Sequence, residues 1–360
     1  MKWKRIIDAE KAWQRRAEII GRHIFGNFPS SMVYKTLRSQ ETLIINDIKI
    51  EYKKIKNKWY VDESSFARAL NAQERKILSV YPEARLNRII YRYGITKLMK
   101  EEKKRLGYPE NRLVFIGTND TASYWYCAQK SLYKQIDMEQ EFFASYLTDR
   151  ILYSIRLGYV KDVPRDEREL LGAGDNLTMN DIERILADYP ADLLEQRKKD
   201  KEKTNKLLSM AKSAFRNSPI AFGKFAEKAL SEVYPTVRWN FRYNDYVVLG
   251  VPDGITNNFV YEFKTANNLE TMRRIVDAQA DLYGYFFRRP EKRIQIYLKR
   301  EDKIITTQEP VKIDNALTTL QKATYVYEGG NPFPPKEWKC RYCEYLSRCP
   351  ITPLKRNASR

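Results

Sequence analysis

The stretch Tyr246 to Lys264, YVVLGVPDGITNNFVYEFK, sets the architecture of the second half of the chain. Its apolar runs at 246–251 and 259–264 have the length and the β-branched and aromatic content of strands. Thr256-Asn257-Asn258 lies between them and is a turn signal. The stretch therefore predicts two strands connected by a hairpin.

Three charged residues lie on this predicted hairpin. Asp253 follows the first strand, and Glu262 lies in the second, so a hairpin of this length brings the two carboxylates side by side. Side chains two apart in a strand face the same way, which places Glu262 and Lys264 on one face. Two converging carboxylates suit Mg²⁺ or Mn²⁺, and a nearby lysine can contact a phosphate or orient the attacking water. The alternative interpretation is a surface salt bridge.

Helices and further strands surround this hairpin. The order from residue 223 is helix, three strands, helix, two strands, helix, which predicts an α/β (α+β) fold with a mixed central sheet flanked by helices. The expected elements are 223–233, 237–243, 246–251, 259–264, 269–287, 293–298, 303–307 and 314–325.

We divide the chain near residue 112. Residues 1–111 form a mostly helical accessory region, with a short hairpin around Asn46-Asp47. Residues 112–352 form the second domain, which contains a helical insertion at 139–218 and ends in a cysteine cluster. Within that insertion, the charge run 196–206 is typical of a solvated helix face. Residues 353–360 form a basic tail.

Composition limits the class of protein. The 360 residues carry 65 Lys+Arg against 46 Asp+Glu, a formal net charge of +19 that favours a polyanionic partner. No apolar run approaches the roughly twenty residues that span a bilayer. The 4 cysteines are too sparse for a secreted disulfide scaffold. We therefore predict a soluble, cytoplasmic protein with no membrane partner.

Residues outside the hairpin could complete a site with Asp253, Glu262 and Lys264. Glu227, on the preceding helix, could supply a third carboxylate as a metal ligand. On the following helix, Gln279 and Tyr283 are four apart and share a face, so they could position a phosphate or strand. Arg273 and Arg274 could bind phosphates. For each of these residues, the alternative is an ordinary contact or a solvated helix face.

The cysteines form a separate candidate site. Cys340, Cys343 and Cys349 have the spacing C-x2-C-x5-C, and Cys127 lies more than two hundred residues earlier. Four thiolates can hold zinc or a 4Fe–4S cluster. Four unrelated buried or free cysteines are the alternative, which their clustering near the end of the chain disfavours.

These motifs resemble those of the RecB-type PD-(D/E)xK nucleases that carry an iron–sulfur cluster. Pro252-Asp253 and Glu262-Phe263-Lys264 spell the signature, and Gln279 to Tyr283 matches the Q-x3-Y element of the RecB branch. Glu227 stands where the family often has a histidine, and His23, the only histidine, lies outside the motif region. The segments around the cysteines, 125–130 and 338–350, are similar to the first and closing cysteine segments, although Ala128 and Gln129 depart from Y-C-P-R.

The resemblance covers about residues 113–352 and is closest to the fourth CRISPR-associated (Cas) exonuclease family. It implies a restriction-endonuclease-like sheet and a Mg²⁺- or Mn²⁺-dependent deoxyribonuclease acting as an exonuclease on single-stranded DNA ends, in CRISPR spacer acquisition or DNA repair. It also implies a structural 4Fe–4S cluster rather than zinc. Other DNA-processing or CRISPR adaptation proteins would then be partners. Residues 1–110 have no counterpart in this resemblance.

Two other functions remain open. One is a DNA-binding or complex-scaffolding protein with weak or lost nuclease activity, which the N-terminal extension and the positive charge favour. The other is a zinc-stabilised nucleic-acid module.

Overall fold

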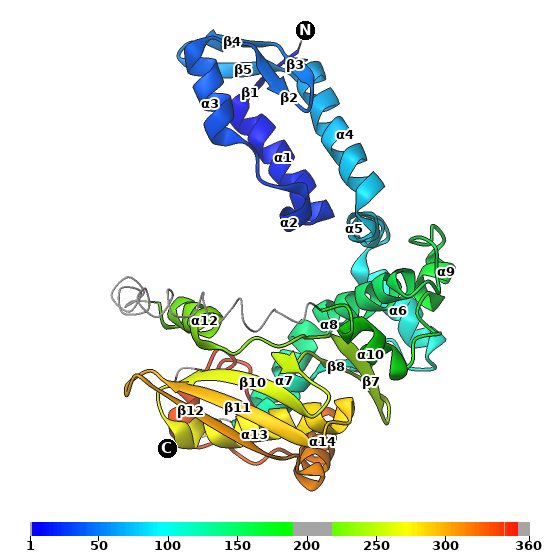
Figure 1. Cartoon of the computed structure of the whole chain (residues 1–360), viewed down its shortest axis with the longest axis vertical. Coiled ribbons are helices and arrows are strands. Elements are labelled where there is room, and N and C mark those ends of the chain that lie inside the picture. Colours follow the sequence, from blue (N-terminus) through cyan, green and yellow to red (C-terminus); the bar gives the residue numbers. More distant parts are fainter. Residues whose placement is uncertain (1, 190–217, 342, 352–360) are drawn as a thin grey trace. The chain divides into compact units, whose positions relative to one another are not determined.

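The computed structural model describes residues 2–189, 218–341 and 343–351 (Figure 1). Contacts divide the chain into two compact units. The first comprises Met1–Glu102 with Arg150–Asn176, and the second comprises Lys103–Asp149 with Leu177–Arg360. The division falls inside the long helix α8 (Ala128–Arg156), so residues 150–176 pack with the first unit. We had expected them in the second domain, as part of the insertion.

The first unit combines helices with two small sheets. Its hairpin has the predicted turn, since Asn46 and Asp47 both have positive φ. A second, three-stranded sheet of order β1-β5-β4 was not predicted. Its turn residues Lys56 and Asn57 also have positive φ, but no glycine in the sequence indicates this turn. The elements are β1 (Trp3–Arg5), α1 (Ile6–Ile20), α2 (Arg22–Phe25), α3 (Ser30–Ser39), β2 (Leu43–Ile45), β3 (Ile48–Ile50), β4 (Tyr52–Ile55), β5 (Lys58–Asp62), α4 (Glu63–Val80), α5 (Pro82–Tyr93), α6 (Ile95–Arg105), which crosses the division, and α9 (Glu167–Gly172).

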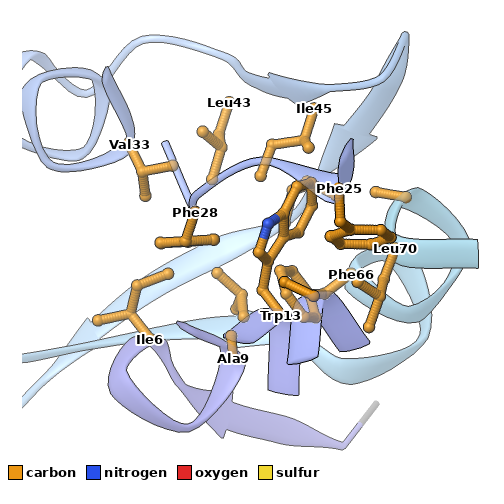
Figure 2. Close-up of a cluster of buried hydrophobic side chains, with 14 of the residues drawn as sticks. Ile6, Ala9, Trp13, Phe25, Phe28, Val33, Leu43, Ile45, Phe66 and Leu70 are labelled. Carbon is orange, nitrogen blue, oxygen red and sulfur yellow. The ribbon is translucent and has the colours of Figure 1, made fainter. Parts of the chain in front are cut away.

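Trp13 of α1 lies in the middle of the hydrophobic core of the first unit (Figure 2). It is 4% exposed, and its ring meets the ring of Phe25 at 5.2 Å and that of Phe28 at 5.9 Å, both edge to face. The indole Nε1–H donates to the carbonyl of Gly26 at 3.1 Å, which satisfies the one polar group of the ring. This core holds α1 against α4 and the β2–β3 hairpin.

The strands of the second unit form two sheets, where one central sheet was expected. One sheet is three-stranded, of order β6-β8-β7, and the other is four-stranded, of order β12-β11-β10-β9. The chain passes from one sheet to the other at Val251-Pro252, where proline has no N–H to continue a ladder. The strands are β6 (Phe115–Gly117), β7 (Trp239–Tyr243), β8 (Tyr246–Gly250), β9 (Gly254–Ile255), β10 (Phe259–Ala266), β11 (Glu291–Leu298) and β12 (Lys303–Pro310).

Helices cover both faces of the four-stranded sheet. Helix α13 (Leu269–Phe287) connects the parallel strands β10 and β11, and its Val276 and Ala280 pack on the face that carries Ile294 and Ile296. Helix α12 (Pro219–Leu230) packs against the opposite face, on Tyr261 and Phe263. Because side chains alternate along β10, Glu262 and Lys264 lie on the α13 face. The fold of this unit is therefore α+β, with mixed sheets.

The remaining helices are α7 (Thr118–Ala122), the 3-10 turn η1 (Ser123–Trp125), α8, α10 (Asn180–Leu186), α14 (Ile313–Tyr327) and α15 (Glu337–Cys340). The Thr118 hydroxyl at the start of α7 donates to the carbonyl of Leu249 at 2.9 Å. The predicted charge run 196–206 and the basic tail 353–360 lie outside the described residues. None of the helices in the described ranges has the length and apolar character needed to cross a bilayer.

Candidate active site and cysteine cluster

Asp253 is held next to the middle of β10. The short strand β9 pairs antiparallel with β10, with Gly254 opposite Tyr261 and Ile255 opposite Val260. The backbone N–H of Phe263 then donates to Asp253 Oδ2 at 2.8 Å. The strand that brings Asp253 to β10 is therefore β9, and not the preceding strand β8, which belongs to the other sheet.

Glu262 is the most buried acid of this group, at 1% exposure. Its Oε1 accepts a hydrogen bond from Gln279 Nε2 at 2.8 Å and pairs with the ammonium group of Lys264. Its Oε2 is buried and has no hydrogen-bond partner among the described residues. Burial, followed by the negative charge of Asp253, raises the pKa of Glu262 to about 8.

Lys264 lies on the same face of β10 as Glu262, and its side chain is 26% exposed. Burial alone would lower the pKa of Lys264, but the charges of Glu262 and Asp253 outweigh that effect and raise it. The ammonium group therefore stays protonated at neutral pH. Its partial exposure leaves a cation at the open side of the acidic pair.

Gln279 and Tyr283 approach Glu262 from helix α13. The helix begins after Asn268, whose side chain accepts the N–H of Glu270 at 2.8 Å as an N-cap. One turn separates Gln279 from Tyr283, and the Gln279 Nε2 atom also lies 3.3 Å from the Tyr283 hydroxyl oxygen. Tyr283 is 3% exposed, and burial, followed by the charge of Glu262, raises its pKa. The structure thus brings both predicted residues to Glu262.

Glu227 reaches the same charges from α12. It is exposed, whereas Ala226 beside it is buried against the sheet. Partial burial, followed by the charge of Asp253, raises the pKa of Glu227, and the positive charge of Lys264 opposes this shift. The third predicted carboxylate is therefore within electrostatic range of the other two.

The residues around Glu262 fit a divalent cation by their chemistry, not by a preformed coordination geometry. As the side chains lie, no three of the histidine, cysteine, aspartate and glutamate residues in the described ranges are arranged to hold a metal ion. However, Glu262 Oε2 lacks a partner among the described residues, and the charge of Asp253 raises the pKa of both Glu227 and Glu262. Oxygen ligands of this kind are those that Mg²⁺ and Mn²⁺ prefer.

The two arginines of α13 are already engaged. Arg273 pairs with Asp277 at 2.9 Å and with Glu309 at 3.4 Å. The Arg274 guanidinium lies 3.7 Å from the centre of the Trp125 ring.

A buried ion pair between Lys292 and Asp281 in the second unit was not predicted from the sequence. Lys292 Nζ lies 2.8 Å from Asp281 Oδ1, and both side chains are fully buried. Lys292 belongs to the charged strand start 291–293, and nothing in the sequence pairs it with a helix residue eleven positions earlier.

The cysteines gather at a second place in this unit. Cys127, Cys340, Cys343 and Cys349 all line one cavity of about 20 Å³, a volume that one water molecule would fill. Cys340 and Cys349 are buried, and Cys127 and Cys343 are half-buried. Burial is the main cause of the raised pKa of Cys127, and the charges of Cys349 and Cys343 add to it. A bound cation would relieve this repulsion, so the thiols fit a metal centre by their chemistry.

Side chains beside the cysteines clasp α8 to the C-terminal segment. The Arg348 guanidinium lies against the rings of Tyr133 and Tyr345, 4.5 and 4.6 Å from their centres, and the two ring centres are 5.4 Å apart. It also donates to Asp137 Oδ2 at 2.6 Å. The hydroxyl of Tyr133 donates to the carbonyl of Arg348 at 2.9 Å. These contacts bring Cys127 and Cys349 to the same cavity without a covalent link.

His23, which the sequence placed outside the site, lies in the first unit, where its Nε2 is 3.3 Å from Glu83.

Comparisons with known proteins do not assign the chain to a family. No family model matches it, and no curated protein matches it. Among solved structures, the crystal structure of SSO0001 is 15% identical, with alignment over 71% of this chain and 95% of that chain and a TM-score of 0.32. A likeness at that score carries no argument about fold or function.

Proposed function

We propose that the protein is a metal-dependent deoxyribonuclease that hydrolyses phosphodiester bonds at single-stranded DNA ends. One observation carries the proposal: Asp253, Glu262 and Lys264 lie together on β10 and the short strand beside it, and Glu262 keeps one buried oxygen without a hydrogen-bond partner. A buried polar atom without a partner costs free energy, and a cation would offset that cost.

Each residue has a role in this proposal. Asp253, Glu262 and Glu227 would bind Mg²⁺ or Mn²⁺, which when bound lowers the pKa of its water and neutralises charge on the phosphate. Lys264 contacts the scissile phosphate or orients the attacking water. Gln279 fixes the Glu262 carboxylate through its 2.8 Å hydrogen bond, and Tyr283 supports Gln279.

The cysteines have a structural role in the proposal. Cys127, Cys340, Cys343 and Cys349 would hold a 4Fe–4S cluster that fastens α8 to the C-terminal segment. Closing so long a loop removes entropy from the unfolded chain. Zinc is the alternative, and a colourless, zinc-loaded protein prepared without air would support it.

The wider setting follows from the motif resemblance alone. The protein would be a RecB-type nuclease with a restriction-endonuclease-like core, closest to the fourth CRISPR-associated exonuclease family. Spacer acquisition and DNA repair are the two processes in which such an enzyme would act.

The deciding experiment is a nuclease assay with protein purified without air, on single strands labelled at the 5′ or 3′ end. Wild-type protein should degrade the strands with Mn²⁺ or Mg²⁺ and stop when the metal is chelated. Glu262→Ala and Lys264→Ala should lose this activity. Glu301→Ala, in the β11–β12 turn, and Lys303→Ala, at the first residue of β12, are matched controls at exposed positions and should keep it. If Glu262→Ala degraded DNA as fast as wild type, the proposal would be wrong.

A second candidate function is a DNA-binding or scaffolding protein with weak or lost nuclease activity. The pairing of Lys264 with Glu262, and the lack of a preformed three-ligand site in the described ranges, favour it. Tight DNA binding by wild type without cleavage under any divalent metal would select this function.

A further inference from the structure

A groove rich in arginine crosses the first unit, far along the chain from the candidate nuclease residues. It consists of two hollows of about 580 and 380 Å³ that share Arg88 and Arg92 of α5. The larger hollow is bounded by α1, α4 and α5, and the smaller by α4 and α5. We call this surface the α5 groove; its arginines are Arg15, Arg16, Arg85, Arg88 and Arg92.

The positive charge of the α5 groove is poorly neutralised. Glu74 is the only acidic residue among the described residues that line the groove. It forms ion pairs with both Arg16 and Arg88, and its carboxylate lies 3.4 Å from Arg88. Arg85 pairs with Asp162.

Arg15 and Arg92 point their charge at solvent. Both are exposed, and neither has an ion pair among the described residues. Burial, followed by the charge of Arg88, lowers the pKa of Arg16. The fold therefore keeps like charges close together at a cost in free energy, and a bound anion would offset that cost.

The arginines of α5 form a row. Residues three and four apart lie on one face of a helix, so Arg85, Arg88 and Arg92 line one edge of the groove over about 10 Å. Arg15 and Arg16 of α1 lie along the larger hollow, which α5 also borders. A chain of phosphates matches such a row better than one small anion does.

The groove also has apolar surface. Leu70, Leu78 and Ile89 contribute aliphatic side chains to its lining, and Tyr91 is 58% exposed in the larger hollow. An exposed ring beside arginines can stack on an unpaired base. A duplex hides its base faces and offers mainly phosphates, so this combination favours a single strand.

We infer that the α5 groove binds single-stranded DNA, with its arginines on the phosphates and Tyr91 stacked on a base. This site goes beyond the proposed nuclease centre and does not depend on it. It gives residues 1–102, which have no counterpart in the motif resemblance, a function in holding the nucleic acid.

The test measures binding of a fluorescent single strand to the full chain in chelator, so that no cleavage occurs. The variant Arg88→Glu/Arg92→Glu should bind at least tenfold more weakly and show a flatter salt dependence, since each lost phosphate contact reduces the slope by about 0.7. The control Arg38→Glu/Arg68→Glu changes net charge equally at exposed positions that do not line the groove, and it should bind within about threefold of wild type. Equal weakening by both double variants would overturn the inference.

Substitution of Tyr91 separates stacking from charge. Tyr91→Ala should weaken binding by about fivefold or more, and Tyr91→Phe should not. Equal competition by duplex DNA or by polyglutamate would overturn the assignment to a single strand. Unchanged circular dichroism of each variant shows that it has folded.

The nuclease proposal is tested separately, by metal-dependent cleavage at saturating DNA. If wild-type protein cleaves DNA but the groove variants bind as tightly as wild type, only the groove inference is wrong. If the groove variants bind more weakly but wild-type protein does not cleave DNA, only the nuclease proposal is wrong.

Discussion

The side-chain amide of Gln279 donates a 2.8 Å hydrogen bond to Glu262 Oε1, and this bond connects the middle of α13 to β10. Glu262 has only one other partner among the described residues, Lys264, so Gln279 fixes the direction of a buried carboxylate. The bond is charge-assisted whenever Glu262 is ionised, and such bonds are stronger than neutral ones.

Replacing Gln279 should therefore reduce metal-dependent cleavage. For Gln279→Ala we expect a loss of about 10- to 100-fold in kcat/KM, which corresponds to one hydrogen bond to a charged group. Initial rates across a Mn²⁺ titration provide the measurement. Gln321→Ala, on the exposed side of α14, is the control and should retain wild-type rates. An unchanged rate in Gln279→Ala would show that the bond does not position a reacting group.

Loss of one cysteine should remove the metal centre. Cys349→Ser should abolish the broad visible absorbance and the bound iron of protein prepared without air, and should lower the thermal midpoint, because the closed loop opens. Arg341→Ala, an exposed neighbour, should keep both properties. Iron and sulfide analysis, with absorption spectra, checks the prediction, and metal that persists in Cys349→Ser would exclude Cys349 as a ligand.

The N-cap of α4 predicts a pH effect on the first unit. Hydrogen bonds from Ser64 and then Ser65 lower the pKa of Asp62 below its ordinary value of about 3.9. A lowered folded-state pKa stabilises the fold above the unfolded-state pKa, and this contribution disappears as pH falls through the folded-state value.

Asp62→Asn keeps a capping side chain but cannot ionise. Its stability deficit relative to wild type should therefore be present at pH 6 and shrink as pH falls below about 4. Urea denaturation at a series of pH values measures the difference. The control is Asp47→Asn, in the exposed β2–β3 turn. Its difference from wild type in the free energy of unfolding should not show the pH dependence expected for Asp62→Asn.

The core of the first unit should depend strongly on Trp13 (Figure 2). Trp13→Ala leaves a cavity between Phe25 and Phe28 and should cost about 3–5 kcal/mol. Hydrogen exchange followed by mass spectrometry should show the loss of protection in peptides of the first unit. Phe333→Ala, at a position that is 85% exposed, should leave exchange unchanged. Intact protection in Trp13→Ala would contradict the assigned core.

Much of the local structure could be predicted from the sequence because it depends on neighbouring residues. The Asn46-Asp47 turn, the alternation that puts Glu262 and Lys264 on one face, and the one-turn spacing of Gln279 and Tyr283 all follow from backbone geometry.

Long-range packing could not be predicted in the same way. Two sheets formed where one was expected, and residues 150–176 pack with the first unit. Arg273 was expected on a phosphate and instead lies between Asp277 and Glu309. Partners of a charged side chain depend on which elements pack together, and sequence spacing does not contain that information.

Which side chains share a face could be derived from residue spacing alone, since the period of a strand or helix is fixed by its backbone. The packing of the elements was needed to show that Gln279 contacts Glu262, that four cysteines line one cavity, and that five arginines border one groove. These contacts join residues far apart in the chain, and the burial of apolar surface that brings them together has no direction of its own.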